Sequence, residues 1–334
     1  MKHTLDSRRS FLLKGLGAGA ALATGPGLLG SARAQASDYP NRPIRLIVPF
    51  PAGQGSDLAA RLLTDQMNKT LPQRIIIENR GGSDGSVGVA SVARAKPDGY
   101  LLAFGTNATH AANAAYGNLP YDPVADFDPI GLFYGGGMVL LVAPNSPVQN
   151  VQQFIALAKA NPGVVNVGIA STTSRVVLAM MREGFGIDIV AVPYKGATAV
   201  LTDLLGGHIP FAIESMTATV PRIQGGELRA LVISPPKASR LLPNIPTLEE
   251  SGATKGSSLG TWTAFFGPKG TPVPVLNTLN KAMNDGIRTT QVQEFLARVG
   301  SDSLIVTPAE AAQHVQNEVK RWAEIIKKYN IKQV

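Results

Sequence analysis

The segment 49–57, Pro-Phe-Pro-Ala-Gly-Gln-Gly-Ser-Asp, combines residue types that could bind an anion. The apolar run 44–48 before it predicts a buried strand, and 57–68 after it predicts a helix capped by Ser56 or Asp57. A glycine loop between a strand and a helix leaves backbone N–H groups without acceptors, and the helix dipole favours an anion beside them. We therefore expect this loop to hold a carboxylate. A turn that needs glycine only for its backbone angles is the open alternative.

Two better-known loop motifs fit this segment incompletely. The run 53–58 begins like the dinucleotide-binding pattern G-x-G-x-x-G, but Leu58 stands where the third glycine should allow close helix packing. No lysine follows the loop, as a phosphate-binding P-loop would require. The loop therefore predicts neither a nucleotide site nor a cofactor site.

A second glycine-rich loop, 81–85, matches the nucleophile motif G-x-S-x-G at Ser83. The polar residues 78–80 separate it from the predicted strand before it, which is atypical of a nucleophile elbow. A periplasmic hydrolase that uses Ser83 is kept as the alternative function.

The composition excludes several classes of site. With 334 residues, 44% apolar and 16% charged, the chain can form two globular domains. It has no cysteine, which excludes disulfides, thiolate metal ligands and cysteine nucleophiles. The four histidines show no metal-ligand spacing, so we expect neither a metal nor a cofactor.

The N-terminus predicts an export signal over residues 1–36. The run 7–14, Ser-Arg-Arg-Ser-Phe-Leu-Leu-Lys, resembles a twin-arginine signal, and a Gly/Ala/Leu-rich stretch leads to a small-residue cleavage site at 32–34 or 34–36. We expect a soluble mature protein in a bacterial periplasm, with a retained membrane anchor as the alternative.

Removing the signal lowers the formal charge from +8 to +4, because this segment carries five of the Lys and Arg residues and Asp6. No basic cluster alternates with aromatic residues, so nucleic-acid binding is not indicated.

The elements around the first loop predict a parallel sheet. Strands at 44–48, 74–80 and 100–104 alternate with helices at 57–68 and 86–95, which is a βαβαβ unit. Its three loops, including Thr106 and Asn107 after the third strand, should meet in a crevice at one sheet edge.

The second half repeats this pattern. Helix 150–160 is followed by strands at 164–169, 187–192, 209–213 and 228–233, and helices lie between them. A further strand, 260–267, leads to helices at 273–287, 290–299 and 308–329, each with one apolar stripe that must pack on the first domain. We therefore predict a discontinuous first lobe, 39–142 and 261–334, and a second lobe, 143–260. Strands near 140–143 and 260–266 should act as hinges.

Several motifs in order resemble the Bug family, the periplasmic solute-binding proteins of tripartite tricarboxylate transporters. They are Tyr-Pro-Asn-Arg-Pro-Ile-Arg-Leu-Ile-Val-Pro-Phe-Pro-Ala-Gly at 39–53, Pro-Asp-Gly-Tyr at 97–100, Leu-Pro-Tyr-Asp-Pro at 119–123, Val-Pro-Tyr-Lys-Gly at 192–196, Leu-Leu-Gly-Gly at 204–207, Leu-Pro-Asn-Ile-Pro-Thr at 242–247 and Gly-Pro-Lys-Gly-Thr-Pro at 267–272. The resemblance covers residues 39–334.

This resemblance implies an α/β, type 2 periplasmic-binding fold: two lobes, each a sheet flanked by helices, with a cleft between them. It implies a monomeric receptor rather than an enzyme, which binds a small organic anion (a carboxylate or an amino acid) and delivers it to membrane permease subunits. The ligand-binding residues that it implies are Ala52, Gly53, Gln54, Gly55, Ser56, Asp57, Thr106, Asn107, Ser171, Thr172, Thr173, Ser174, Pro193, Tyr194, Lys195, Gly196, Glu214 and Ser215.

The chain departs from the family pattern in two loops. The loop 170–175 is shorter than usual, with Arg175 where histidine is common, and Gln54 brings a side chain where the family often has glycine. Individual roles remain open: Asp57 could cap the helix or bind ligand, and Lys195 could face the cleft or solvent. Glu214 could cap a helix, orient a loop or receive a cationic group of the ligand.

Overall fold

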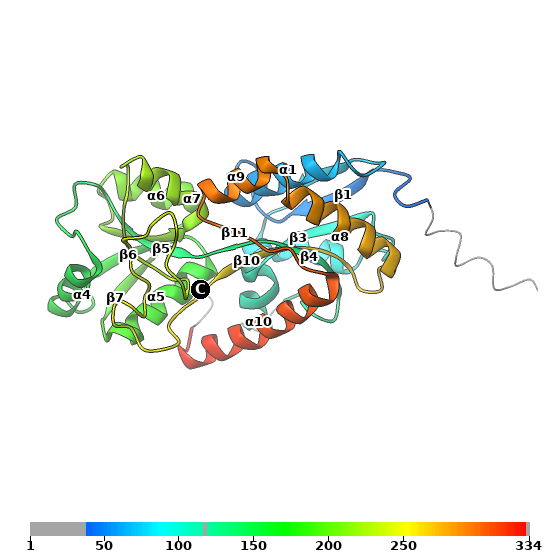
Figure 1. The fold of residues 1–334 in the computed structure, drawn as a ribbon. Helices are drawn as coiled ribbons and strands as arrows, with labels where there is room; N and C mark the ends of the chain where they lie inside the picture. The colour runs from blue at the N-terminus through cyan, green and yellow to red at the C-terminus, as the bar shows by residue number, and fades with distance from the viewer. Residues whose placement is uncertain (1–37, 116–118, 332–334) are drawn as a thin grey trace, which may run out of the picture. The chain divides into compact units, whose positions relative to one another are not determined.

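The computed structural model describes residues 38–115 and 119–331, and the predicted export signal lies outside them. Contacts divide the chain into Met1–Asp38 and Tyr39–Val334, and the following description concerns the second unit. In this unit the chain forms two mixed sheets with helices on both faces (Figure 1). This arrangement confirms the predicted α/β architecture.

The first sheet has the strand order β11-β4-β10-β3-β1-β2. Its strands are β1 (Ile44–Val48), β2 (Ile75–Asn79), β3 (Leu101–Thr106), β4 (Phe127–Gly136), β10 (Thr261–Pro268) and β11 (Asp302–Ser303). Strand β1 pairs in parallel with β2 and β3, as the βαβαβ pattern predicts, and β10 runs antiparallel to β3 and β4.

Helices cover both faces of this sheet. They are α1 (Gly55–Met67), α2 (Ser86–Ala93), α3 (Asn113–Ala115), α8 (Val273–Ile287), α9 (Thr290–Arg298) and α10 (Pro308–Lys328). A 3₁₀ turn covers Ser83–Gly85 and a π-helical turn Ala108–Ala112. Helices α8 and α10 pack on β4, which confirms that the C-terminal helices return to the first sheet.

The second sheet has the order β7-β6-β8-β5-β9. Its strands are β5 (Met138–Val142), β6 (Val165–Ile169), β7 (Ile189–Pro193), β8 (Phe211–Ser215) and β9 (Arg229–Ile233). Its helices are α4 (Val151–Ala160), α5 (Thr172–Phe185), α6 (Ala197–Leu205) and α7 (Met216–Gln224). The parallel pairing of β6 with β7 and β8 repeats the logic of the first sheet.

The chain crosses between the sheets at Gly137 and again before β10. A β-carbon on Gly137 would lie 2.2 Å from Cγ of Pro235, so only glycine fits this crossing. The predicted lobe boundary at 142 assigns β5 to the first lobe, whereas its pairing with β8 and β9 makes it part of the second sheet. The run Gly135–Gly137 divides one apolar stretch into two strands that belong to different sheets.

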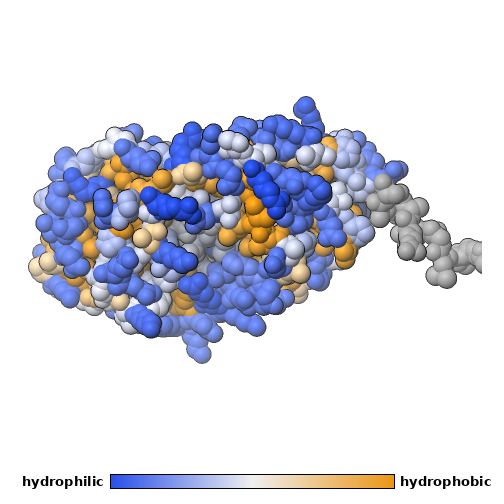
Figure 2. Space-filling model, in the orientation of Figure 1, coloured by the Kyte–Doolittle hydropathy of each residue, from blue (hydrophilic) through white to orange (hydrophobic). Residues whose placement is uncertain are grey.

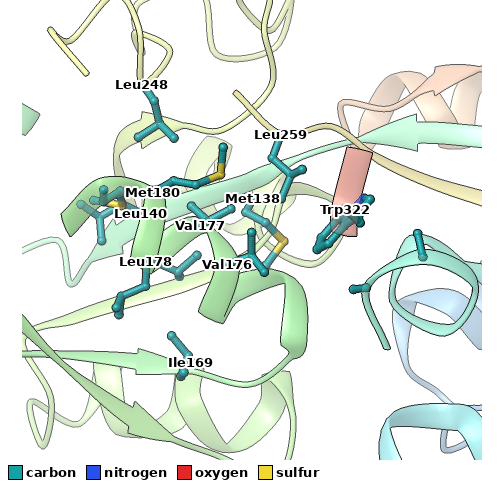
Figure 3. Close-up of a cluster of buried hydrophobic side chains, with 14 of the residues drawn as sticks. Met138, Leu140, Ile169, Val176, Val177, Leu178, Met180, Leu248, Leu259 and Trp322 are labelled. Atoms are coloured by element: carbon teal, nitrogen blue, oxygen red, sulfur yellow. The ribbon is translucent and has the colours of Figure 1, made fainter. Parts of the chain in front are cut away.

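One hydrophobic cluster continues through both sheets. Its members around the crossing include Met138 and Leu259, with Trp322 of α10 beside them (Figure 3). Trp322 is fully buried, and its indole N–H donates to Glu318 at 3.2 Å. The core thus joins the two sheets, while the face in Figure 2 is mostly hydrophilic, with separate apolar patches.

Gly105 in β3 tests how tightly this core is packed. A β-carbon there would lie 2.4 Å from the ring of Phe266 and 2.5 Å from that of His110, so Gly105→Ala should lower the free energy of unfolding by about 1–3 kcal/mol through overpacking. Gly225→Ala is the control, because its nearest atom would be 3.4 Å away; it should change stability by less than about 0.5 kcal/mol in urea unfolding. Equal stability of the two variants would contradict the packing described here.

Candidate ligand-binding site

Four helices begin where the carboxyl edges of the two sheets face each other. Helix α1 follows β1, and α5, α6 and α7 follow β6, β7 and β8. A β-carbon on Gly196, at the start of α6, would lie 3.5 Å from Nε2 of Gln54, and one on Gly55 would lie 3.9 Å from Thr217 of α7. The positive ends of these helix dipoles therefore lie around the same space between the sheets, which favours an anion.

The first turn of α1 keeps part of the expected set of free donors. The N–H groups of Gly55, Ser56 and Asp57 have no hydrogen-bond acceptor among the described residues. Two further donors of the loop are occupied: Gly53 N–H donates to Asp57 Oδ2 at 2.8 Å, and Gln54 N–H to the carbonyl of Pro51 at 3.4 Å.

Asp57 does not cap α1 as predicted, and neither does Ser56. Gln54 is the N-cap and makes no side-chain capping bond, while the Asp57 carboxylate reaches back to the loop. Arg61 and Asn79 also donate to it, at 2.9 and 2.8 Å. Burial opposes its ionisation, but these three bonds outweigh burial and hold the pKa of Asp57 below its usual value. The paired carboxylate thus fixes the loop.

The Ser/Thr cluster at 171–174 caps the start of α5. Ser171 is the N-cap, its side chain accepts the N–H of Ser174, and Ser174 completes a capping box. The N–H groups of Thr172 and Thr173 have no acceptor among the described residues. These two donors are therefore available to a ligand in the space between the sheets.

The threonine side chains at this position form hydrogen bonds with the first lobe. Thr173 Oγ1 accepts from Asn107 Nδ2 at 2.9 Å, and Thr172 Oγ1 donates to Asp84 Oδ2 at 3.1 Å and lies 3.3 Å from Asn113 Oδ1. These bonds join the second lobe to the first, because the two sheet edges are in direct contact here. The O–H of Thr173 donates to no acceptor among the described residues.

Tyr194, Lys195 and Glu214 of the second lobe differ in their burial and in their hydrogen-bond partners. Tyr194 is held by its own lobe, since its hydroxyl donates to Asp203 at 2.7 Å, and Lys195 is exposed. Glu214 accepts the N–H of Ser215 at 2.7 Å and is buried. Burial raises the pKa of Glu214, although the bonds from Ser215 partly oppose this.

Burial separates the centre of the site from its margin. The buried members are Asp57, Thr106, Asn107, Thr172, Thr173, Ser174 and Glu214; the half-buried ones are Gln54, Gly55, Ser56, Ser171, Tyr194, Gly196 and Ser215; and the exposed ones are Ala52, Gly53, Pro193 and Lys195. Arg175 is half-buried on α5. Thr106 is engaged in its own turn with Thr109.

Sequence reasoning missed three residues that join the lobes: Asp84, Asn113 and Thr217. Asp84 lies in the second glycine-rich loop, where Ser83 and Asp84 both have left-handed backbones, with φ of 45° and 52°. That loop at the same sheet edge was the available signal. Asn113 and Thr217 had none, because their contacts come from distant segments.

Ser83 lacks the setting of a nucleophile. It lies in a 3₁₀ turn after the end of β2, and none of its hydrogen bonds within the described residues involves a histidine. His110 is fully buried and stacked on Phe266, with ring centroids 3.8 Å apart, and burial lowers its pKa to about 3. The ring is therefore uncharged at neutral pH and has a packing role.

Among the described residues, no group of three or more His, Asp or Glu side chains could hold a metal ion. No helix in that part of the chain has the length and apolar character needed to span a membrane.

Comparison with known proteins gives a consistent result. Residues 59–331 match the family described as "Tripartite tricarboxylate transporter family receptor". The chain is 35% identical to the Agrobacterium vitis "UPF0065 protein in the TAR-I ttuE-ttuC' intergenic region", over 88% of this chain and 86% of the relative. It is 31% identical to Bordetella pertussis "Protein BugT", over 90% of this chain and 94% of the relative.

Solved structures share the two-lobed fold. The periplasmic binding protein BugD superposes with a TM-score of 0.80 at 32% identity, covering 89% of this chain and 100% of that chain. R. palustris Rpa4515, solved with adipate, has a TM-score of 0.82 at 29% identity, covering 89% and 100%. MatC from Rhodopseudomonas palustris, solved with bound malate, has a TM-score of 0.78 at 31% identity, covering 86% and 100%.

The bond between Asp84 and Thr172 should couple the two lobes energetically. In a double-mutant cycle of Asp84→Ala and Thr172→Val, the two losses of unfolding free energy should differ from additivity by about 0.5–1.5 kcal/mol. Asp84→Ala combined with Thr198→Val, an exposed threonine of α6, should be additive within about 0.5 kcal/mol. Additivity of the first pair in urea unfolding would mean that this contact does not form in solution.

Glu214 should make stability depend on pH in a defined direction. The pKa of Glu214 is raised from 4.5 in the folded chain. At high pH its charged carboxylate therefore destabilises the folded state relative to the unfolded state, and this cost disappears at low pH, where Glu214 is protonated in both the folded and the unfolded state. Glu214→Gln should therefore raise the free energy of unfolding at pH 8, and the gain should shrink as the pH falls toward 4.5.

Urea unfolding across this pH range measures the effect. Glu324→Gln, at an exposed position of α10, is the control and should show no such trend. A gain for Glu214→Gln that grows toward low pH would contradict the buried, unpaired carboxylate described here.

Proposed function

This chain belongs to the tripartite tricarboxylate transporter receptor family, and we propose that it encloses a small carboxylate-bearing solute between its lobes without changing it chemically. The solute is then delivered to the membrane permease subunits of such a transporter. The family and fold are those of solute-binding receptors.

One observation carries this proposal: N–H groups at the starts of α1 and α5 have no acceptor within residues 38–115 and 119–331, although both helices begin between the lobes. They belong to Gly55, Ser56 and Asp57 on one side and to Thr172 and Thr173 on the other. A carboxylate offers several acceptor positions and a negative charge, and it would satisfy donors that water would otherwise have to satisfy.

The relatives support the choice of a carboxylate. MatC was solved with malate and Rpa4515 with adipate, both dicarboxylates, and both share the two-lobed fold with this chain. We propose the same class of small organic acid here, including amino acids, because the buried Glu214 could receive a cationic group. Arg175 and Gln54, where the loops depart from the family pattern, would then influence which acid is chosen.

Several further parts of the proposal concern the whole protein. We propose a discontinuous first lobe that includes 261–334 and a second lobe that begins with β5 rather than at 143, because β5 pairs in the second sheet. We also propose that the protein is exported by the twin-arginine route and is a soluble monomer in the periplasm. We propose that its ligand site consists of the predicted residues together with Asp84, Asn113 and Thr217.

The first experiment is a thermal-shift screen of malate, adipate, citrate, aspartate and benzoate, followed by calorimetric titration of any acid that stabilises the protein. A ligand present at 100 times its Kd should stabilise the fold by about 2.7 kcal/mol. Incubation followed by mass analysis should return the acid unchanged. Failure of every acid to stabilise the protein would overturn the carboxylate proposal, and turnover would overturn the receptor proposal.

Gly55 allows a single donor to be removed. Proline is well accommodated at the first helical position, and Gln54 before it has an extended backbone, with φ −75° and ψ 161°, that suits a residue preceding proline. Gly55→Pro should therefore leave the ligand-free melting temperature unchanged or raised, while the Kd for the acid rises about 10- to 100-fold.

Gly55→Ala is the matched control, because it adds a side chain at the same position but keeps the N–H. A β-carbon there has ordinary space, 3.9 Å from Thr217, so the Kd should stay within about 3-fold of the unmodified protein. If both variants bind equally well, the Gly55 N–H does not contact the ligand.

A further inference from the structure

A second hollow lies on the other side of the strands that connect the lobes. It is a cavity of about 570 Å³, and we name it the hinge cavity. Its base is formed by the crossing segments at Gly136 and Thr261, one wall by the first lobe at Leu296 and Leu304, and the other wall by the second lobe at Leu241. Its volume is typical of sites for small molecules.

Sheet order places the hinge cavity and the candidate ligand site on opposite sides of the crossing. The candidate site lies at the ends of β3 and β1 in one sheet and of β8 and β6 in the other. The cavity instead lies beside β11 and the segment that follows β9, which flank the crossing strands on the other side in each sheet. Met216, at the start of α7, is the part of its lining that adjoins the candidate site. A rotation of the lobes about the crossing that opens one side must therefore narrow the other.

The interior of the hinge cavity is largely apolar, and one buried polar atom of its lining, Nε2 of His314, has no hydrogen-bond partner among the described residues. Trp262 lines it with Leu296, Leu304 and Leu241, and the Trp262 indole N–H donates to the buried Glu318 at 3.0 Å. His314 packs edge-on against Trp262, and burial is the main cause that lowers its pKa, so its ring is neutral at pH 7. The charged pair of Arg240 with Asp302 is more than four-fifths exposed and belongs to the rim.

We propose that the hinge cavity binds a small, uncharged, mainly apolar molecule, and that its occupant favours closure of the lobes on the other side. An apolar interior of this size gains free energy when such a molecule displaces water. The walls belong to different lobes, so an occupant that fits the closed form resists the rotation that would narrow the cavity. Binding at the two sites should therefore be positively coupled, because both ligands favour the same state.

Cyclohexanol is a suitable probe, because it is uncharged and does not absorb where tryptophan is excited. Trp262 and Trp322 are the two tryptophans of the chain, and Trp262 lines the cavity, so their emission reports directly on the site. A saturable change with a Kd on the order of 1 mM or tighter is expected for a molecule of this size. A change that only rises linearly with concentration would overturn the proposal.

Matched substitutions locate the binding. Ala297 and Ala238 are exposed residues on the first-lobe and second-lobe walls, and Ala297→Phe or Ala238→Phe should raise the Kd for cyclohexanol about 10-fold by filling the space. Ala309→Phe, at an exposed position of α10 away from the cavity, should leave it within about 2-fold. Equal effects of all three variants, or none, would place the probe elsewhere and overturn the site.

The coupling rests on the proposed function and is tested separately. With saturating acid from the screen above, the Kd for cyclohexanol should fall about 3-fold or more, and the Kd for the acid should fall by the same factor with cyclohexanol present. No change, or weaker binding, would overturn the coupling while leaving the cavity as a binding site. Because cyclohexanol binding is also measured without any acid, failure of the carboxylate proposal would be seen independently.

Discussion

Backbone N–H groups in the first turn of a helix have no acceptor within that helix, and the site is organised by this constraint. The chain satisfies the constraint in different ways at different helices. At the start of α5 a capping box satisfies one backbone N–H, and near α1 the carboxylate of Asp57 accepts the N–H of Gly53 in the preceding loop. At both helices other N–H groups face the space between the lobes. The parallel order of the sheets matters because it brings these helix starts to facing edges.

Charged side chains near the site add selectivity to the attraction between the helix N-termini and an anion. The Asp57 carboxylate is paired with Arg61, whereas the buried Glu214 has no ion-pair partner in the part of the chain that the structure describes, and Asp84 bonds a threonine hydroxyl. A ligand between the lobes therefore meets helix dipoles and uncharged donors together with two acidic side chains of the protein. Such a setting favours a solute with few negative charges, or one that carries a positive group as well.

Local patterns in the sequence predicted most of the fold, and long-range contacts account for most of the differences. The order of strands, glycine loops and helices predicted β1 to β3 and β6 to β9, because each signal lies within one element. Asp57 was misassigned as a cap because an acidic residue in the first turn can reach either forward to the helix or back to the loop.

The site was foreseeable only where a loop has its own signature. The start of α1 could be found from its own residues, and the Ser/Thr cluster at the start of α5 from the resemblance to the family. The partners of Thr172 and Thr173 could not, because Asp84, Asn107 and Asn113 reach them only after the two sheets have assembled. Likewise, the glycines at Gly135–Gly137 carry no local signal that the chain changes sheets there.

The second sheet is topologically an insertion into the first, because Gly136 and Thr261, on either side of it, are paired neighbours in adjacent strands. A short turn between these residues would complete the first sheet without any of the second. The shared hydrophobic cluster opposes such modularity, since Trp322 packs beside Met138 and Leu259 across the crossing. Exchange of lobes between relatives, by recombination or by engineering, would therefore have to transfer the matching face of the C-terminal helix as well.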